Sequence, residues 1–140
     1  MGENMIHYIY KSSYLDVWIC EDHSYKTTHK SLNKVLDELC ILRLSTLEGM
    51  QTSIKNLFDF HSKIPLYLGD SLFLFPLKGL RGKESLYINY FSIKEIIPIT
   101  KKICYIQFID YHELKCDIFH ILNKQIEKCE KILAYVNNQF

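Results

Sequence analysis

The segment Ser45–Ile93 constrains the fold of this chain most, because a helix start, a strand hairpin, a basic loop and an apolar strand follow one another within it. Ser45 and Glu48 have the spacing of a capping box, in which side chains bond the unpaired backbone donors at a helix N-terminus. We therefore expect a helix to begin at Thr46. Pro65 disfavours helical geometry in the residue before it, so the helix has to end upstream of Pro65.

This central helix, expected over residues 46–60, has two distinct faces. Gln51 and Lys55 fall on the side that should face water, and the N-terminus near Gly49 could receive a phosphate. The apolar side recurs at helical spacing and is predicted to be buried. Its members are Leu47, Met50, Ile54, Leu57 and Phe58.

Two apolar runs follow the helix, Ile64–Leu68 and Ser71–Leu77. Gly69 and Asp70 separate them, which predicts an antiparallel hairpin with a tight turn. Pro76 has no amide donor, so it marks a strand end or an edge.

The order of these features resembles the central region of the competence transcription factor (ComK) family. Members of the family typically show an S-x-Y-x-G-R-K-like segment, a K-[VI]-P-[IV] strand, an F-x-F-P-T strand end and a W-[IV]-[SN] strand after a loop of fixed length. The most specific point of likeness is the spacing between the Phe-x-Phe-Pro strand end and the strand that follows the loop. The matching residues here are Glu48-Gly49, Lys63-Ile64-Pro65-Leu66, Phe73-Leu74-Phe75-Pro76 and Tyr87-Ile88-Asn89.

The resemblance implies a bacterial DNA-binding regulator that activates competence (DNA uptake) genes from A/T-rich promoter sites and acts as an oligomer. Two departures from the pattern are visible. Gly49-Met50-Gln51 stands where the family has Gly-Arg-Lys, and Tyr87 stands where the family usually has Trp. The lost charges keep an alternative open, a protein-interaction module derived from a ComK protein with weakened or lost DNA binding.

The loop Lys78–Glu84 carries the best candidates for DNA contacts. Its glycines and basic side chains could enter a groove, and the alternative is a solvated turn. Its spacing is not that of a nucleotide-binding P-loop. Arg81 is expected to insert into the minor groove, and the lysines should contact phosphates. The full set of expected DNA-binding residues is Gln51, Lys55, Lys78, Arg81 and Lys83.

Composition is consistent with one domain spanning residues 1–140, with a best family match at 45–93. Hydrophobic residues make up 48% of the 140-residue chain, which is enough for a core. The net charge is only +1, so a DNA-binding surface has to be local. Residues 45–102 hold eight Lys or Arg and five Asp or Glu, so the positive excess lies in the centre.

The flanking segments predict further strands and helices. Met5–Tyr10 and Tyr14–Cys20 alternate as two strands, with Trp18 expected in the core and a short third strand possible in Glu21–Lys30. The later segments predict a helix near 31–42, a strand that breaks midway between Leu86 and Ile99, a C-terminal hairpin over Ile103–Ile118 and a helix near 119–137.

The expected fold class is α+β, an antiparallel sheet of hairpins with about three packed helices. The core should depend on large apolar side chains of the central segment. These are Leu57, Phe58, Phe73, Phe75 and Ile88.

The last helix carries a narrow apolar seam that allows two interpretations. The seam can dock on the sheet, which we favour, or it can form a homo-oligomer contact. Its residues are Leu122, Ile126, Cys129, Leu133 and Val136.

The remaining signals argue against a secreted, membrane-bound or catalytic protein. The five cysteines are scattered without a C-x-x-C pair, so we expect free thiols in the cytoplasm. His112, Cys116 and His120 share a helical spacing, but a turn near His112 breaks it, and we assign neither a metal nor a cofactor. No signal peptide, membrane span or catalytic motif is evident, so a small enzyme is the least favoured function.

Overall fold

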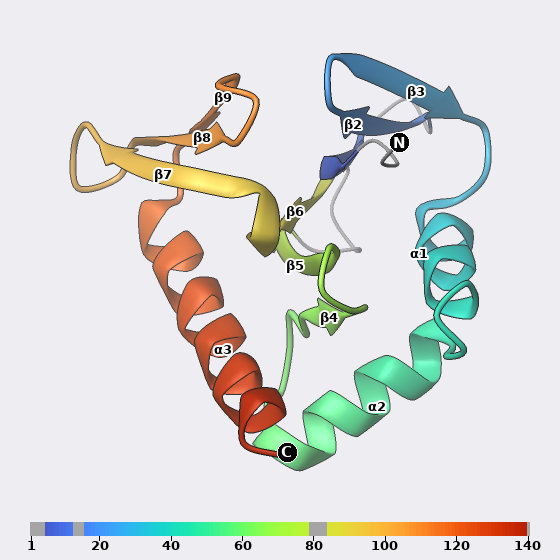
Figure 1. Ribbon diagram of the computed structural model, residues 1–140. Coiled ribbons are helices and arrows are strands. Elements are labelled where there is room, and N and C mark those ends of the chain that lie inside the picture. Colours follow the sequence, from blue (N-terminus) through green and yellow to red (C-terminus); the bar gives the residue numbers. More distant parts are fainter. Residues whose placement is uncertain (1–4, 13–15, 79–83, 140) are drawn as a thin grey trace.

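The computed structural model describes residues 5–12, 16–78 and 84–139. Within these residues antiparallel strands and α-helices are both present, which confirms the α+β class (Figure 1). The helices are α1 (Leu32–Ile41), α2 (Leu47–Phe58) and α3 (Phe119–Asn137), close to the three predicted ranges. The strands are β1 (Ile6–Lys11), β2 (Val17–Glu21), β3 (Ser24–Thr28), β4 (Leu66–Tyr67), β5 (Phe73–Lys78), β6 (Ser85–Asn89), β7 (Ile93–Pro98), β8 (Cys104–Phe108) and β9 (Glu113–Cys116).

The N-terminal and central strands form one antiparallel sheet, here called sheet A, in the order β3-β2-β1-β6-β5-β4. The two predicted hairpins are confirmed, and β1 joins them by pairing with β6. Gly69 has a φ of 120°, a value that favours glycine, in the turn between β4 and β5.

The C-terminal strands form a separate sheet, sheet B, in the order β7-β8-β9. The prediction of a single sheet was therefore wrong. The cause is the 3-10 turn Tyr90–Ser92, which breaks the long apolar strand midway, as expected, and redirects the chain. Asn89 caps this turn by accepting a hydrogen bond from the Phe91 amide at 3.2 Å.

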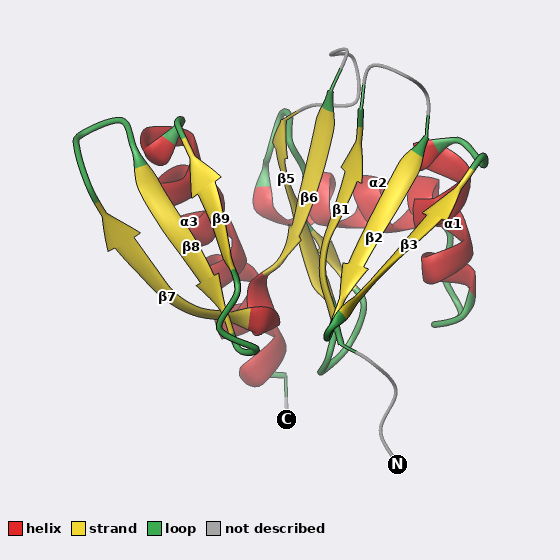
Figure 2. Ribbon diagram, turned by 90° about the horizontal axis from the view of Figure 1, so that it is seen from above, coloured by secondary structure: helices red, strands yellow, loops and turns green. Residues whose placement is uncertain are grey.

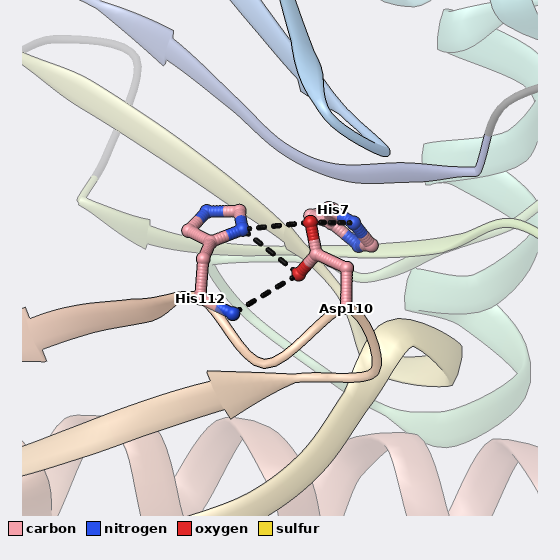
Figure 3. A group of neighbouring side chains, drawn as sticks. All are labelled: His7, Asp110 and His112. Atoms are coloured by element: carbon pink, nitrogen blue, oxygen red, sulfur yellow. Dashed lines mark hydrogen bonds and ion pairs between the residues drawn. The ribbon is translucent and has the colours of Figure 1, made fainter.

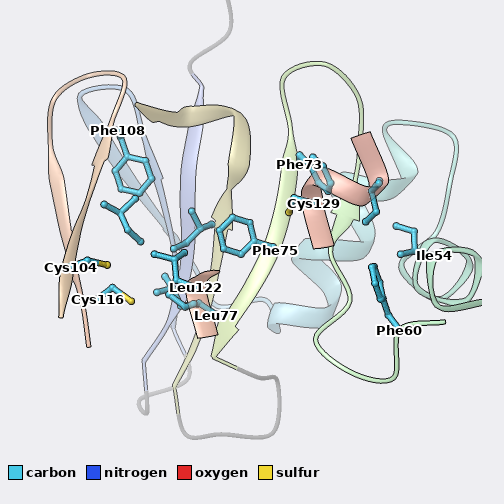
Figure 4. Close-up of a cluster of buried hydrophobic side chains, with 14 residues drawn as sticks. Ile54, Phe60, Phe73, Phe75, Leu77, Cys104, Phe108, Cys116, Leu122 and Cys129 are labelled. Atoms are coloured by element: carbon cyan, nitrogen blue, oxygen red, sulfur yellow. The ribbon is translucent and has the colours of Figure 1, made fainter. Parts of the chain in front are cut away.

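The two faces of sheet A are covered differently (Figure 2). α1 and α2 cover one face, and Ile9, Val17 and Leu74 pack beneath them. α3 and sheet B lie on the other face, around the buried cluster drawn in Figure 4. The sheet is therefore the middle layer of the molecule.

The predicted core is confirmed in the strands and wrong in part of the helix. Phe73, Phe75 and Ile88 are fully buried. Leu57, however, is 54% exposed, because α2 turns this position outward near its C-terminus. Phe58 is partly buried and stacks on Phe60 with ring centroids 5.5 Å apart.

The start of α2 differs by one residue from the capping-box prediction. Thr46, not Ser45, is the N-cap, and its hydroxyl accepts a hydrogen bond from the Gly49 amide at 2.9 Å. A side chain on Gly49 would place its Cβ 2.9 Å from that hydroxyl, which is too close. The Glu-Gly sequence thus fits this helix start.

α3 packs against the sheets of its own chain. This is the interpretation of its apolar seam that the sequence analysis favoured. Leu122 and Cys129 are fully buried. The Gln125 side chain is also buried, and it donates hydrogen bonds to the carbonyls of Lys63 at 2.9 Å and Pro76 at 2.8 Å. Pro76 lies beyond the part of β5 that pairs with β4, so α3 covers an open strand edge there.

Two further expectations concern single side chains. The five cysteines are all free and buried, as predicted. Trp18 is 40% exposed, so its predicted place in the core was wrong. It lines a pocket with Tyr8, Tyr10 and Tyr25, and the first two of these also line the cleft toward β9.

Candidate nucleic-acid interface

The ends of three neighbouring strands of sheet A bring two lysines to one end of the sheet (Figure 2). Lys11 ends β1 and pairs with Ser85 at the start of β6. Lys78 ends β5 and pairs with Leu86, which also belongs to β6. Because adjacent strands lie about 4.8 Å apart, the backbones at Lys11 and Lys78 are separated by about 10 Å across β6.

The most important predicted contacts belong to the connection between β5 and β6. Arg81 and Lys83 lie outside the described residues, and for Lys78 the structure describes only the backbone. The flanking strand ends nevertheless fix where this connection leaves and re-enters the sheet. It does so beside Lys11, a basic residue that the sequence analysis did not select.

The other two predicted residues lie on α2, in a different setting. Lys55 is exposed in the last turn of α2. Gln51 is partly buried and lines a groove of about 610 Å³ between α1 and α2. Asp37 and Glu48 line the same groove with only Lys34 to offset them, so its net charge is negative and does not favour a phosphate. Gln51 therefore faces α1 rather than the lysine-bearing strand ends.

The N-terminus of α2 is not a free phosphate site, contrary to the expectation above. The amide of Leu47 donates to Asp37 Oδ1 at 2.8 Å, and the amide of Gly49 donates to Thr46 at 2.9 Å. These side chains occupy donors that an anion would need.

A cleft of about 300 Å³ separates β6 and β1 from β9, the nearest strand of sheet B. Tyr8 and Tyr10 form one wall, and Lys115 and Asp117 lie on the other. The tyrosine wall continues to Trp18 and Tyr25, which are 40% and 61% exposed. The alternation of aromatic residues in β1 and β2 was the sequence signal for this face, but Trp18 was assigned to the core instead.

Two more exposed lysines, Lys101 and Lys102, lie in the turn between β7 and β8. The Thr100 hydroxyl shapes this turn by accepting hydrogen bonds from the amides of Lys102 and Ile103 at 3.2 and 3.0 Å. Figure 2 places the turn at the same end of the molecule as Lys11 and Lys78. The Lys-Lys pair was visible in the sequence and was not selected, since it lay outside the motifs.

No helix in the described part of the chain is long and apolar enough to cross a membrane.

Comparisons with known proteins give one result. A family model described as ComK protein matches residues 5–140, nearly the whole chain. No curated protein and no solved structure matches the chain significantly. The match extends well beyond the central motifs to both flanking regions, and the chain belongs to the ComK family of competence transcription factors.

Proposed function

We propose that this protein activates competence genes by binding A/T-rich double-stranded promoter DNA in the bacterial cytoplasm. The observation that carries this proposal is the family match over residues 5–140. The arrangement of sheet A supports it, because Lys11 and Lys78 flank the connection that holds Arg81 and Lys83.

The minor groove of A/T-rich DNA suits such a basic strand end. A/T pairs present acceptor atoms there, and A-tracts narrow the groove and strengthen its negative potential. Arg81 is the residue proposed to enter the groove, and Lys78 and Lys83 are proposed to contact the bordering phosphates. Lys11 is added as a fourth contact because of its place beside β6.

This chain lacks the Arg-Lys pair that the family has after the glycine at position 49. The distribution of charge supports DNA binding without that pair. The two corresponding positions are Met50, which packs against the core, and Gln51, which lines the groove between α1 and α2 with Asp37 and Glu48. A phosphate contact is not favoured there, so the strand ends and the β5–β6 connection are the better source of affinity. Lys55, which is exposed in the last turn of α2, is accordingly proposed as a secondary phosphate contact, whereas Gln51 is not proposed as one.

Self-association on DNA is a further part of the proposal. The α3 seam packs inside its own chain, since Leu122 and Cys129 are fully buried. A dimer contact would therefore use exposed positions of α3, such as Tyr135, which is 40% exposed. A two-fold pair would place two sets of strand ends on one duplex.

Fluorescence anisotropy with a labelled A/T-rich duplex tests the proposed contacts. Arg81→Ala should weaken binding by about 1–3 kcal/mol, because it removes a groove contact. Lys94→Ala removes one positive charge from an exposed position at the start of β7, the opposite end of that strand from Lys101 and Lys102, and serves as the matched control, with binding unchanged. Equal losses in both variants would show that total charge, rather than the β5–β6 connection, determines affinity.

A further inference from the structure

Three metal-ligating side chains from distant parts of the sequence meet where sheet B approaches sheet A (Figure 3). His7 comes from β1, and Asp110 and His112 come from the turn between β8 and β9. One ligand atom from each residue lies within 4.8 Å of the other two. The sequence analysis did not combine these residues, since more than a hundred residues separate His7 from Asp110 and His112.

A β-bulge explains why His7 points toward this site. Ile6 pairs with Glu21 and Tyr8 pairs with Cys20, so His7 is an extra residue in β1 with no partner in β2. Such a bulge redirects a side chain, and bulges are frequent next to functional sites. As a result both His7 and Tyr8 lie near Phe108 and His112, on the side of sheet B.

The turn that carries the other two residues is tightly fixed. Tyr111 has a φ of 74°, and its amide donates to the Phe108 carbonyl at 2.8 Å. Asp110 Oδ1 accepts hydrogen bonds from the His112 amide at 3.2 Å and from His112 Nδ1 at 2.9 Å. This contact orients the His112 ring and holds Nδ1 beside the Asp110 carboxylate, where both groups could bind one ion once Nδ1 has no proton.

His7 is the least satisfied polar side chain of the group. It is fully buried, and neither ring nitrogen has a hydrogen bond to any described residue. Asp22 Oδ1 and Asp110 Oδ2 lie 2.7 and 3.3 Å from Nε2, but out of line with a ring N–H. Buried polar groups normally have hydrogen-bond partners, and His7 has only two carboxylates at ion-pair distance, a setting that a bound cation would suit.

We propose that His7, Asp110 and His112 bind a divalent transition-metal ion, with Zn²⁺ as the best match. Imidazole nitrogen and carboxylate oxygen are preferred zinc ligands, whereas Ca²⁺ and Mg²⁺ take oxygen ligands. Ligands about 2.0 Å from a tetrahedral ion lie about 3.3 Å apart. The separation of His7 Nε2 and Asp110 Oδ2 is 3.3 Å. The bound ion would tie the β8–β9 turn to β1 and stabilise the contact between the two sheets.

Cys20 borders the site and suggests a different chemistry, which its burial disfavours. Its Sγ lies 3.4 Å from His112 Nε2, so Cys20, His112 and Asp110 are ordered like a catalytic triad. However, Cys20 is only 1% exposed, and burial raises the pKa of its thiol. A substrate could not reach this sulfur, and the thiolate form that attacks substrates is disfavoured.

Zinc binding by the tag-free, reduced full-length chain tests the proposal. Protein stripped with a chelator is mixed with one equivalent of Zn²⁺, gel-filtered and analysed for bound metal, and competition with a chromophoric chelator gives the affinity. We expect one Zn²⁺ per chain and a higher melting temperature with zinc than without. Since even indirect partners of metal ligands change affinity by about 10–100-fold, His7→Gln and His112→Gln should each weaken binding at least about 100-fold.

The control is His120→Gln, which removes an exposed histidine away from the cluster and should change the affinity less than about twofold. If His7→Gln does not fold, His112→Gln decides, because that side chain is 30% exposed. Failure of the wild-type chain to retain zinc would overturn the proposal. An equal loss in His120→Gln and His112→Gln would do the same, because it would show adventitious binding to surface histidines.

Discussion

At the scale of single residues, the core is tested most directly in β5, by asking which of its side chains point inward. Phe75 is fully buried between sheet A and α3, so Phe75→Ala should lower the free energy of unfolding by about 3–5 kcal/mol. Leu57→Ala is the matched control, since that side chain is 54% exposed and should cost less than about 1 kcal/mol. Urea denaturation measures both, and equal losses would mean that the packing described here is incorrect.

Tyr87 predicts a stability loss at alkaline pH. Burial raises its pKa to about 12 from an ordinary 10.0, because the phenolate is disfavoured in the core. The unfolded chain then loses this proton near pH 10 while the folded chain keeps it. Stability from the neutral phenol is therefore complete below pH 10 and is lost as the pH rises to about 12, by about 3 kcal/mol in total.

The measurement is urea denaturation at several pH values in that window. Tyr87→Phe cannot ionise, so its stability should fall less steeply with pH than that of the wild type. Tyr111→Phe is the control, because Tyr111 is 67% exposed, and its slope should match the wild type. Parallel curves for Tyr87→Phe and the wild type would contradict the burial of the phenol.

The burial of a residue could be predicted from the sequence only where its strand or helix is fully covered by the rest of the fold. Phe73, Phe75 and Ile88 were predicted correctly, since β5 and β6 lie in the middle of a sheet covered on both faces. Trp18 and Leu57 were predicted wrongly, although both are large and apolar. Their exposure depends on where sheet B and α2 end, which periodicity does not reveal.

At the scale of elements, Asn89 holds three parts of the fold together. Its Nδ2 donates to the carbonyls of Ile6 at 2.7 Å and Ser71 at 3.0 Å, and its Oδ1 accepts from the amides of Phe73 at 3.0 Å and Phe91 at 3.2 Å. The side chain thus connects β1, the start of β5 and the turn that separates the two sheets. This gives a structural reason for Asn at the end of the Tyr87-Ile88-Asn89 motif.

Asn89→Ala should destabilise the protein by about 2–4 kcal/mol, because it leaves several buried backbone groups unpaired. Asn56→Ala, at an exposed position of α2, should cost less than about 0.5 kcal/mol. Thermal unfolding followed by circular dichroism compares the two variants. A melting temperature for Asn89→Ala equal to that of Asn56→Ala would mean that the network does not contribute to stability.

The sequence predicted most elements but not the way they assemble. Helix spacing and hairpin turns located α1, α2, α3 and the hairpins, because these signals are local. The division into two sheets could not be predicted, since it depends on how the turn at Tyr90–Ser92 directs the chain. The bulge at His7 was equally invisible, because it is defined only by the pairing of β1 with β2.

At the scale of the whole molecule, the proposed binding to DNA would have to come from local charge. The chain has a net charge of only +1, so long-range attraction to DNA is weak. The strand ends at Lys11 and Lys78 and the basic turn at Lys101 and Lys102 all lie at one end of the molecule (Figure 2). Lys78 was selected from the sequence as a proposed contact, but only the fold shows that Lys11, Lys101 and Lys102 lie at the same end of the molecule.

The most direct test of the central claim is the affinity of the unmodified protein for A/T-rich and G/C-rich duplexes of equal length across a salt series. We predict tighter binding to the A/T-rich duplex at every salt concentration. Phosphate contacts by Lys11, Lys78 and Lys83 predict a slope of log affinity against log salt of about −2.7, three times the value of about −0.9 per contact. Undetectable binding, or equal and salt-independent binding to both duplexes, would contradict the claim and favour a protein-interaction module instead.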